Sequence, residues 1–197
     1  MISIANYQAI LFDLDGTLVD TMPLHYAAYA GALQARGLTL DWVDFMNLIG
    51  PPAKDAIPLF VKCAGGNCDA LEVAKIHNEK KEIFSRILEE QVLKILPAAR
   101  FLSEIENWQS SALVTSGNQR GAKAILEKLN WASRFDTVVT GDDVTCGKPD
   151  PEPFLLAAKR LDVLPARCIV FEDTIDGVAS ARAAGMAVVN VTEVEWS

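Results

Sequence analysis

The sequence is poor in the residues that build zinc and disulfide sites. Its 197 residues include only two histidines and four cysteines, and no two cysteines have the Cys-x-x-Cys spacing. Structural zinc sites need such clusters, so we expect no zinc site. We interpret the cysteines as free thiols in a reducing cytoplasm.

The sequence also lacks an excess of positive charge and any long apolar run. Lysine and arginine number 18 against 26 acidic residues, which gives a net charge of −8. Nucleic acids and anionic membranes bind cationic surfaces, so we expect neither as a partner. A membrane-spanning helix needs about 18 apolar residues in a row, and no stretch approaches that length. The first residues do not have the pattern of a signal peptide, and we expect a cytoplasmic monomer.

Short apolar runs typical of buried strands recur along the chain. They occupy residues 9–12, 112–114, 137–139, 168–171 and 187–191. Helical patterns lie between the later runs, at residues 98–106, 121–129, 153–161 and 175–184. Strands that alternate with helices are typical of a parallel sheet. We therefore predict an α/β fold with a Rossmann-like, three-layer α/β/α core.

A block of helical patterns interrupts this alternation after the first strand. Its apolar periodicity predicts helices at residues 24–33, 42–48, 57–63 and 73–88. A block of about 70 residues is too long for an ordinary crossover between parallel strands. We predict an inserted α-helical cap domain at residues 21–93, and a core formed by residues 1–20 and 94–197.

Two aspartates, Asp13 and Asp15, follow the first apolar run and precede Gly16. Side chains two residues apart on a strand point the same way, so two carboxyl groups are expected in one small space. Such anions repel each other unless a cation or a shared proton relieves them. Oxygen ligands of this kind suit Mg²⁺. A pair of turn aspartates would have the same spacing.

The segment from Asp13 to Thr17, Asp-Leu-Asp-Gly-Thr, resembles the first motif of the haloacid dehalogenase (HAD) superfamily of phosphotransferases. The resemblance implies that Asp13 attacks phosphorus and forms an aspartyl phosphate. It implies that Asp15 gives a proton to the leaving alcohol and later takes one from water. It also implies a Mg²⁺ ion held by the Asp13 carboxylate and the main-chain carbonyl of Asp15.

Two further motifs supply candidate phosphate ligands. Thr115 follows the second core strand, and its hydroxyl with the backbone N–H of Ser116 could hold a phosphate oxygen at a helix N-terminus. Ordinary turn chemistry explains the same residues. Lys148 lies in the string Gly-Lys-Pro-x-Pro, which resembles the third HAD motif, although most lysines are solvated. The resemblance assigns catalytic and phosphate-binding roles to Thr115 and Lys148.

Two acidic residues, Glu172 and Asp173, directly follow the strand predicted at residues 168–171. The resemblance to the fourth HAD motif implies that Asp173 binds the metal directly. It implies that Glu172 is either a ligand or one water molecule removed from the ion. The alternative interpretation is negative charge at a helix N-terminus.

The strings at residues 19–25 and 146–154 narrow the resemblance to the branch that holds β-phosphoglucomutase and small sugar-phosphate phosphatases. Within that branch His25 and Lys80 correspond to residues near the substrate. A structural histidine and a solvated lysine are the simpler interpretations.

The mutase of this branch has an arginine three residues after a cap glycine, whereas Ala53 follows Gly50 at that spacing here. A mutase must hold a bisphosphate in two orientations, so loss of a bidentate arginine favours a phosphatase. We predict a Mg²⁺-dependent phosphatase of a small sugar phosphate, such as fructose 1-phosphate. A phosphomutase is the nearest alternative, and a phospho-aspartate signalling receiver is a remote one. A receiver needs neither Asp15 nor a cap.

Overall fold

The computed structural model describes residues 2–49, 53–105 and 109–196, and the string Gly50-Pro51-Pro52 lies outside them. The chain divides into two compact units. The first consists of Met1–Asp20 and Leu93–Ser197, and the second of Thr21–Val92. In the described residues no helix has both the length and the apolar character that a membrane span requires.

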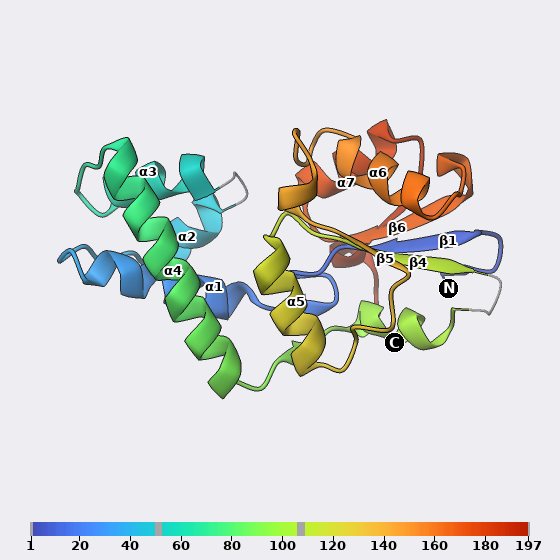
Figure 1. Ribbon diagram of the computed structural model, residues 1–197, viewed down its shortest axis with the longest axis horizontal. Coiled ribbons are helices and arrows are strands. Elements are labelled where there is room, and N and C mark those ends of the chain that lie inside the picture. The colour runs from blue at the N-terminus through green and yellow to red at the C-terminus, as the bar shows by residue number, and fades with distance from the viewer. Residues whose placement is uncertain (1, 50–52, 106–108, 197) are drawn as a thin grey trace. The chain divides into compact units, whose positions relative to one another are not determined.

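The first unit is built on a five-stranded parallel sheet (Figure 1). Its strands are β1 (Ala9–Phe12), β4 (Ser110–Val114), β5 (Thr137–Val139), β6 (Cys168–Glu172) and β7 (Ala187–Asn190). They lie in the order β5-β4-β1-β6-β7, so β1 is central and pairs with β4 and β6. The predicted α/β fold with a parallel sheet and a helical insertion is confirmed.

Helices cover both faces of this sheet. Figure 1 shows α6 (Glu152–Arg160) and α7 (Ile175–Ala183) on one face. On the opposite side lie α5 (Gln119–Lys128) and the 3-10 helix η1 (Pro97–Ser103). Strand side chains alternate between the two layers, as the pleat of a sheet requires. Leu11 and Val170 pack with Phe154 of α6, whereas the rings of Phe12 and Phe171 stack 5.2 Å apart toward η1.

Some elements differ from the prediction. The structure has the 3-10 helix η1 where an α-helix is expected at residues 98–106, of which residue 106 lies outside the described residues. Residues three apart eclipse each other in a 3-10 helix, so Ala98 and Phe101 are both buried there. The structure also contains two two-residue strands that were not predicted, β2 (Val19–Asp20) and β3 (Lys94–Ile95), which pair antiparallel. Short 3-10 helices also occur at Gly141–Asp143 (η2), Pro165–Arg167 (η3) and Val191–Glu193 (η4).

The second unit contains the four helices expected from periodicity. They are α1 (Met22–Gln34), α2 (Trp42–Leu48), α3 (Ala53–Cys63) and α4 (Ala70–Glu90). Asp69 begins α4 by accepting a hydrogen bond of 2.8 Å from the backbone N–H of Glu72. The rings of Tyr29, Phe45 and Phe60 pack at the centre of this unit, which therefore has its own core.

Phe171 connects β6 to the layer that contains η1, so its truncation tests this packing. Its ring is fully buried and lies 4.7 Å from the ring of Phe101. Phe171→Ala should lower the free energy of unfolding by about 3–5 kcal/mol, because it removes buried apolar area and leaves a cavity. Urea denaturation followed by circular dichroism measures this. Leu164→Ala, at a side chain that is 73% exposed, should change it by less than about 0.5 kcal/mol.

Candidate active site

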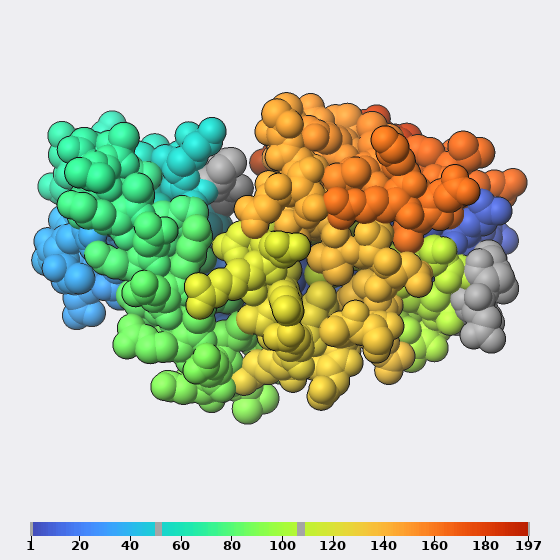
Figure 2. All heavy atoms as spheres, viewed as in Figure 1, coloured from blue at the N-terminus to red at the C-terminus, as the bar shows by residue number. Residues whose placement is uncertain are grey.

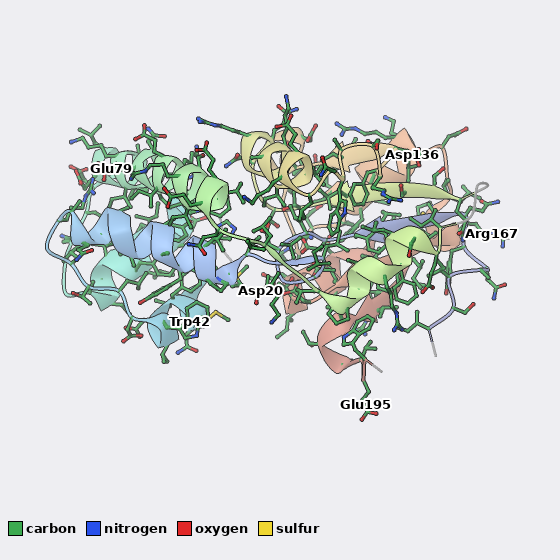
Figure 3. The ribbon with its side chains drawn as sticks, turned by 90° about the horizontal axis from the view of Figure 1, so that it is seen from below. Asp20, Trp42, Glu79, Asp136, Arg167 and Glu195 are labelled. Carbon is green, nitrogen blue, oxygen red and sulfur yellow. The ribbon has the colours of Figure 1, made fainter. Side chains whose placement is uncertain are left out.

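Polar side chains gather where the central strands end. Asp13 directly follows β1, Thr115 follows β4, and Glu172 is the last residue of β6. The backbone N–H of Asp13 still donates to the carbonyl of Phe171 over 3.0 Å, so the ladder extends to that residue. Figure 3 shows Asp136 and Arg167, which precede β5 and β6, at the end of the sheet away from Asp20. The candidate site thus occupies the carboxyl end of the sheet, where open α/β folds bind ligands.

Lys148 is the central cation of this site. Its Nζ donates to Asp13 Oδ1 and to Glu172 Oε1, both over 2.7 Å, and to the carbonyl of Val114 over 3.0 Å. The lysine side chain is only 5% exposed. A buried ammonium with three acceptors is fixed in place, and it compensates the charge of two carboxylates from different strands.

Three carboxylates form a cluster around this lysine. Oxygen atoms of Asp13, Glu172 and Asp173 all lie within 4.8 Å of one another. One ammonium cannot neutralise three carboxylates. An all-oxygen donor set with excess negative charge fits a hard divalent cation.

The pKa values of the cluster show the same imbalance of charge. Burial raises the pKa of Asp13, the Lys148 cation opposes this, and the other acids raise it further, so that it lies well above its ordinary value. Burial, reinforced by Glu172, raises the pKa of Asp173 to about 6. Burial lowers the pKa of Lys148, but the two carboxylates it contacts more than offset this, so the lysine remains a cation. A bound divalent cation would favour the ionised carboxylates.

Two threonines outside the predicted site residues hold the acids in place. Thr17 Oγ1 donates to Asp173 Oδ1 over 2.9 Å. Glu172 Oε2 accepts from the backbone N–H of Thr174 over 2.6 Å and from its hydroxyl over 2.9 Å. Only the position of Thr174, two residues after Glu172, was a usable signal, since short hydroxyl side chains commonly bond to neighbouring acceptors.

Two glycines make room for the carboxylates. Gly16 has φ +89°, and a Cβ there would lie 2.3 Å from Asp173 Oδ2. A Cβ on Gly177 of α7 would lie 1.7 Å from Glu172 Oε1. The close approach of these backbone segments to the acids therefore requires glycine at both positions.

Thr115 lies beside the second aspartate of the first motif. Its hydroxyl is 3.3 Å from Asp15 Oδ2, to which it donates, and it accepts from the N–H of Gly117 over 3.0 Å. Ser116 is exposed in the same turn. The structure thus brings together Asp13, Asp15, Thr115 and Lys148 with Glu172 and Asp173 at the end of β6.

His25 and Lys80 meet within the second unit. Lys80 Nζ lies 2.8 Å from His25 Nδ1, and the His25 ring stacks on Phe84 at 4.6 Å. The ammonium of Lys80 also lies 4.8 Å from the centre of the Tyr29 ring, and the residue is buried. An ammonium is a donor only, so His25 accepts through Nδ1, which leaves Nε2 to carry the ring proton.

The model of the haloacid dehalogenase-like hydrolase family matches residues 7–185. The chain belongs to this family. It is 37% identical to the phosphorylated carbohydrates phosphatase of Thermotoga maritima over 183 residues, which cover 91% of this chain and 82% of that protein. It is 34% identical to the fructose-1-phosphate phosphatase of Escherichia coli, over 94% of this chain and 97% of the relative.

The structure of CbbY from Rhodobacter sphaeroides in complex with phosphate has the same fold. The TM-score is 0.84 at 28% identity, and the match covers 97% of this chain and 91% of that one. The predicted branch of the HAD family, with its helical cap, is confirmed, and the chain is a phosphoric monoester hydrolase.

The contact between Gly177 and Glu172 gives a direct test of the site geometry. Gly177→Ala should displace the Glu172 carboxylate and with it Lys148, so we expect a loss of turnover of at least about 10-fold. Phosphate release in steady-state assays measures the loss. Gly121→Ala is the matched control, because it also lies in a helix and its Cβ would meet Asn118 Oδ1 at an ordinary 3.5 Å. Equal activity of the two variants would contradict the assigned geometry.

The raised carboxyl pKa values predict an unusual pH dependence of stability without metal. Between about pH 4 and 6 the folded protein binds more protons at Asp173 than the unfolded chain does. The unfolding free energy of the metal-free protein should therefore rise, by on the order of 1–3 kcal/mol, as the pH falls from 7 to 5. Urea titrations in EDTA measure this.

Asp173→Asn is the control for that experiment, because it resembles the protonated acid. It should be more stable than the parent at pH 7 and should show a smaller pH slope. A parent protein that loses stability between pH 7 and 5 would refute the interpretation.

Proposed function

We propose that this chain hydrolyses a small sugar phosphate through an aspartyl phosphate formed on Asp13. The observation that supports this best is that Lys148 bonds to both Asp13 and Glu172 at the carboxyl end of the sheet. Two relatives bear the names of phosphatases of phosphorylated carbohydrates and of fructose 1-phosphate, so we propose a hexose monophosphate as the substrate.

Asp13 acts as the nucleophile in this proposal. One of its oxygens attacks phosphorus, a new P–O bond forms, and the bond from phosphorus to the sugar oxygen breaks. Lys148 is a cation fixed 2.7 Å from Asp13. It lowers the repulsion between the carboxylate and the incoming anionic phosphate, and it offsets charge on the phosphoryl oxygens during transfer.

Asp15 acts as the general acid and base. It gives a proton to the departing sugar oxygen, then takes one from the water that attacks the aspartyl phosphate and releases Asp13. Thr115 donates to its carboxylate, which supports an orienting role for this hydroxyl besides a contact with phosphate. The N–H of Ser116 lies in the same turn and is a second candidate donor to the phosphate.

The acidic cluster fits Mg²⁺ as the cofactor. We propose that Asp13, Asp173 and the main-chain carbonyl of Asp15 hold it. Both oxygens of Glu172 already accept hydrogen bonds, so we place this residue one water molecule from the ion. When bound, Mg²⁺ supplies positive charge to the phosphoryl oxygens.

His25 and Lys80 are the candidate substrate contacts of the cap. With the tautomer inferred above, His25 Nε2 is a donor, which suits a sugar hydroxyl. The contact between the two side chains supports a polar binding site over the alternative that Lys80 is simply solvated.

A screen of sugar and nucleotide monophosphates tests the proposal, with released phosphate as the readout in Mg²⁺ and in EDTA. We expect turnover of hexose monophosphates that requires the metal. Asp13→Asn should reduce it by at least about 10³-fold, because an amide is a poor nucleophile. Near-normal turnover by this variant would refute the assignment of the nucleophile.

The same assay separates hydrolysis from a mutase reaction. With β-glucose 1-phosphate, free phosphate indicates a phosphatase and glucose 6-phosphate indicates a mutase. We expect free phosphate, since no arginine occupies the position where the mutase places one.

A further inference from the structure

The loop at residues 145–150 is formed mostly by exposed residues but carries one buried side chain. All of its residues are exposed except Lys148, whose side chain is 5% exposed and ends among Asp13, Glu172 and Val114. The golden segment between β5 and α6 lies at the surface of the molecule in Figure 2. An exposed loop has many accessible conformations, and contacts outside the active centre can limit them.

One such contact precedes Lys148. The carboxylate of Glu152, the first residue of α6, accepts from the backbone N–H of Thr145 over 3.0 Å and of Cys146 over 2.7 Å. The two bonds use one oxygen each and lower the pKa of Glu152. They fix both peptide planes that lead into the lysine turn.

A second contact follows Lys148. Ser180 of α7 is fully buried, and its Oγ donates to the carbonyl of Asp150 over 2.6 Å. Helix α7 directly follows the strand that ends in Glu172, which is itself an acceptor of Lys148. The bond therefore ties the lysine loop to the element that holds the partner carboxylate.

We propose that Glu152 and Ser180 are positioning residues that hold the loop at residues 145–150 so that Lys148 reaches Asp13. The catalytic consequence rests on the proposed function, whereas the placement of Lys148 does not. Neither residue touches the acid cluster in the described contacts, so both act through the lysine. Glu152 acts at the surface, where water can replace it as the acceptor for the two N–H groups. Its loss should therefore displace Lys148 more than it lowers the stability of the fold.

The first experiment measures the placement of Lys148 without any activity. Wild type and Glu152→Gln are treated briefly with acetic anhydride, and acetylation of Lys148 is compared by mass spectrometry with that of Lys159, an exposed lysine of α6. Glutamine keeps the size of the side chain but offers one acceptor oxygen instead of two. We expect relative labelling of Lys148 to rise at least threefold. Unchanged labelling in both Glu152→Gln and Ser180→Ala would overturn the proposal.

The second experiment is a double-mutant cycle on kcat/KM with Glu152→Gln and Lys148→Ala. In the wild-type background the glutamine variant should lose about 5–20-fold, mostly in kcat. In the Lys148→Ala background it should change less than twofold. Equal losses in both backgrounds would show that Glu152 does not act through Lys148.

Glu127→Ala is the matched control, because this exposed glutamate lies on α5 and pairs only loosely with Lys123, at 3.7 Å. It should leave labelling and kcat/KM unchanged. Thermal melting curves of all variants show whether each one is still folded. If wild type hydrolyses no phosphate ester, the proposed function fails, yet the labelling experiment still decides the positioning role.

Discussion

The structure depends on the compensation of negative charge at one end of a parallel sheet. Adjacent strands end in carboxylates that lie within a few ångströms of one another, and burial makes their repulsion costly. Lys148 offsets part of this charge through ion pairs with Asp13 and Glu172. Because those partners come from β1 and β6, the same ion pairs also fix how the two strand ends face each other. The excess negative charge that remains fits a bound divalent cation.

The strands that carry the acid cluster could be predicted from the sequence, whereas most of the residues that support the cluster could not. The apolar run before Asp13 and the run before Glu172 both predict buried strands, and parallel strands bring their carboxyl ends together. That is why Asp13, Asp173 and Lys148 could be named from motifs and then found in one place. Motifs were informative there because each side chain lies within a residue or two of a strand end or a constrained turn.

Other features of the site and of the fold could not be predicted in this way, for physical reasons. The bond between Thr17 and Asp173 joins residues 156 positions apart, and no local pattern encodes it. The role of Gly177 follows from a close approach between a helix and a carboxylate, which exists only in the folded chain. The pair β2 and β3 is too short to give a periodic signal. The predicted helix at residues 98–106 has suitable spacing, but the structure forms the tighter 3-10 helix η1 at Pro97–Ser103.

The residues proposed for phosphoryl transfer and those proposed for substrate contact lie in different units of the chain. The groups proposed to transfer the phosphoryl group all belong to the unit that contains the sheet, whereas His25 and Lys80 belong to the helical unit, which has its own core. A separate core allows side chains of the helical unit to change without disturbing the packing beneath Asp13. In the proposed mechanism the acid cluster and Lys148 act on the phosphoryl group, which all phosphate monoesters share, so they do not distinguish one sugar from another. The proposed substrate contacts His25 and Lys80 lie instead in the helical unit, which is where this proposal places the choice of sugar.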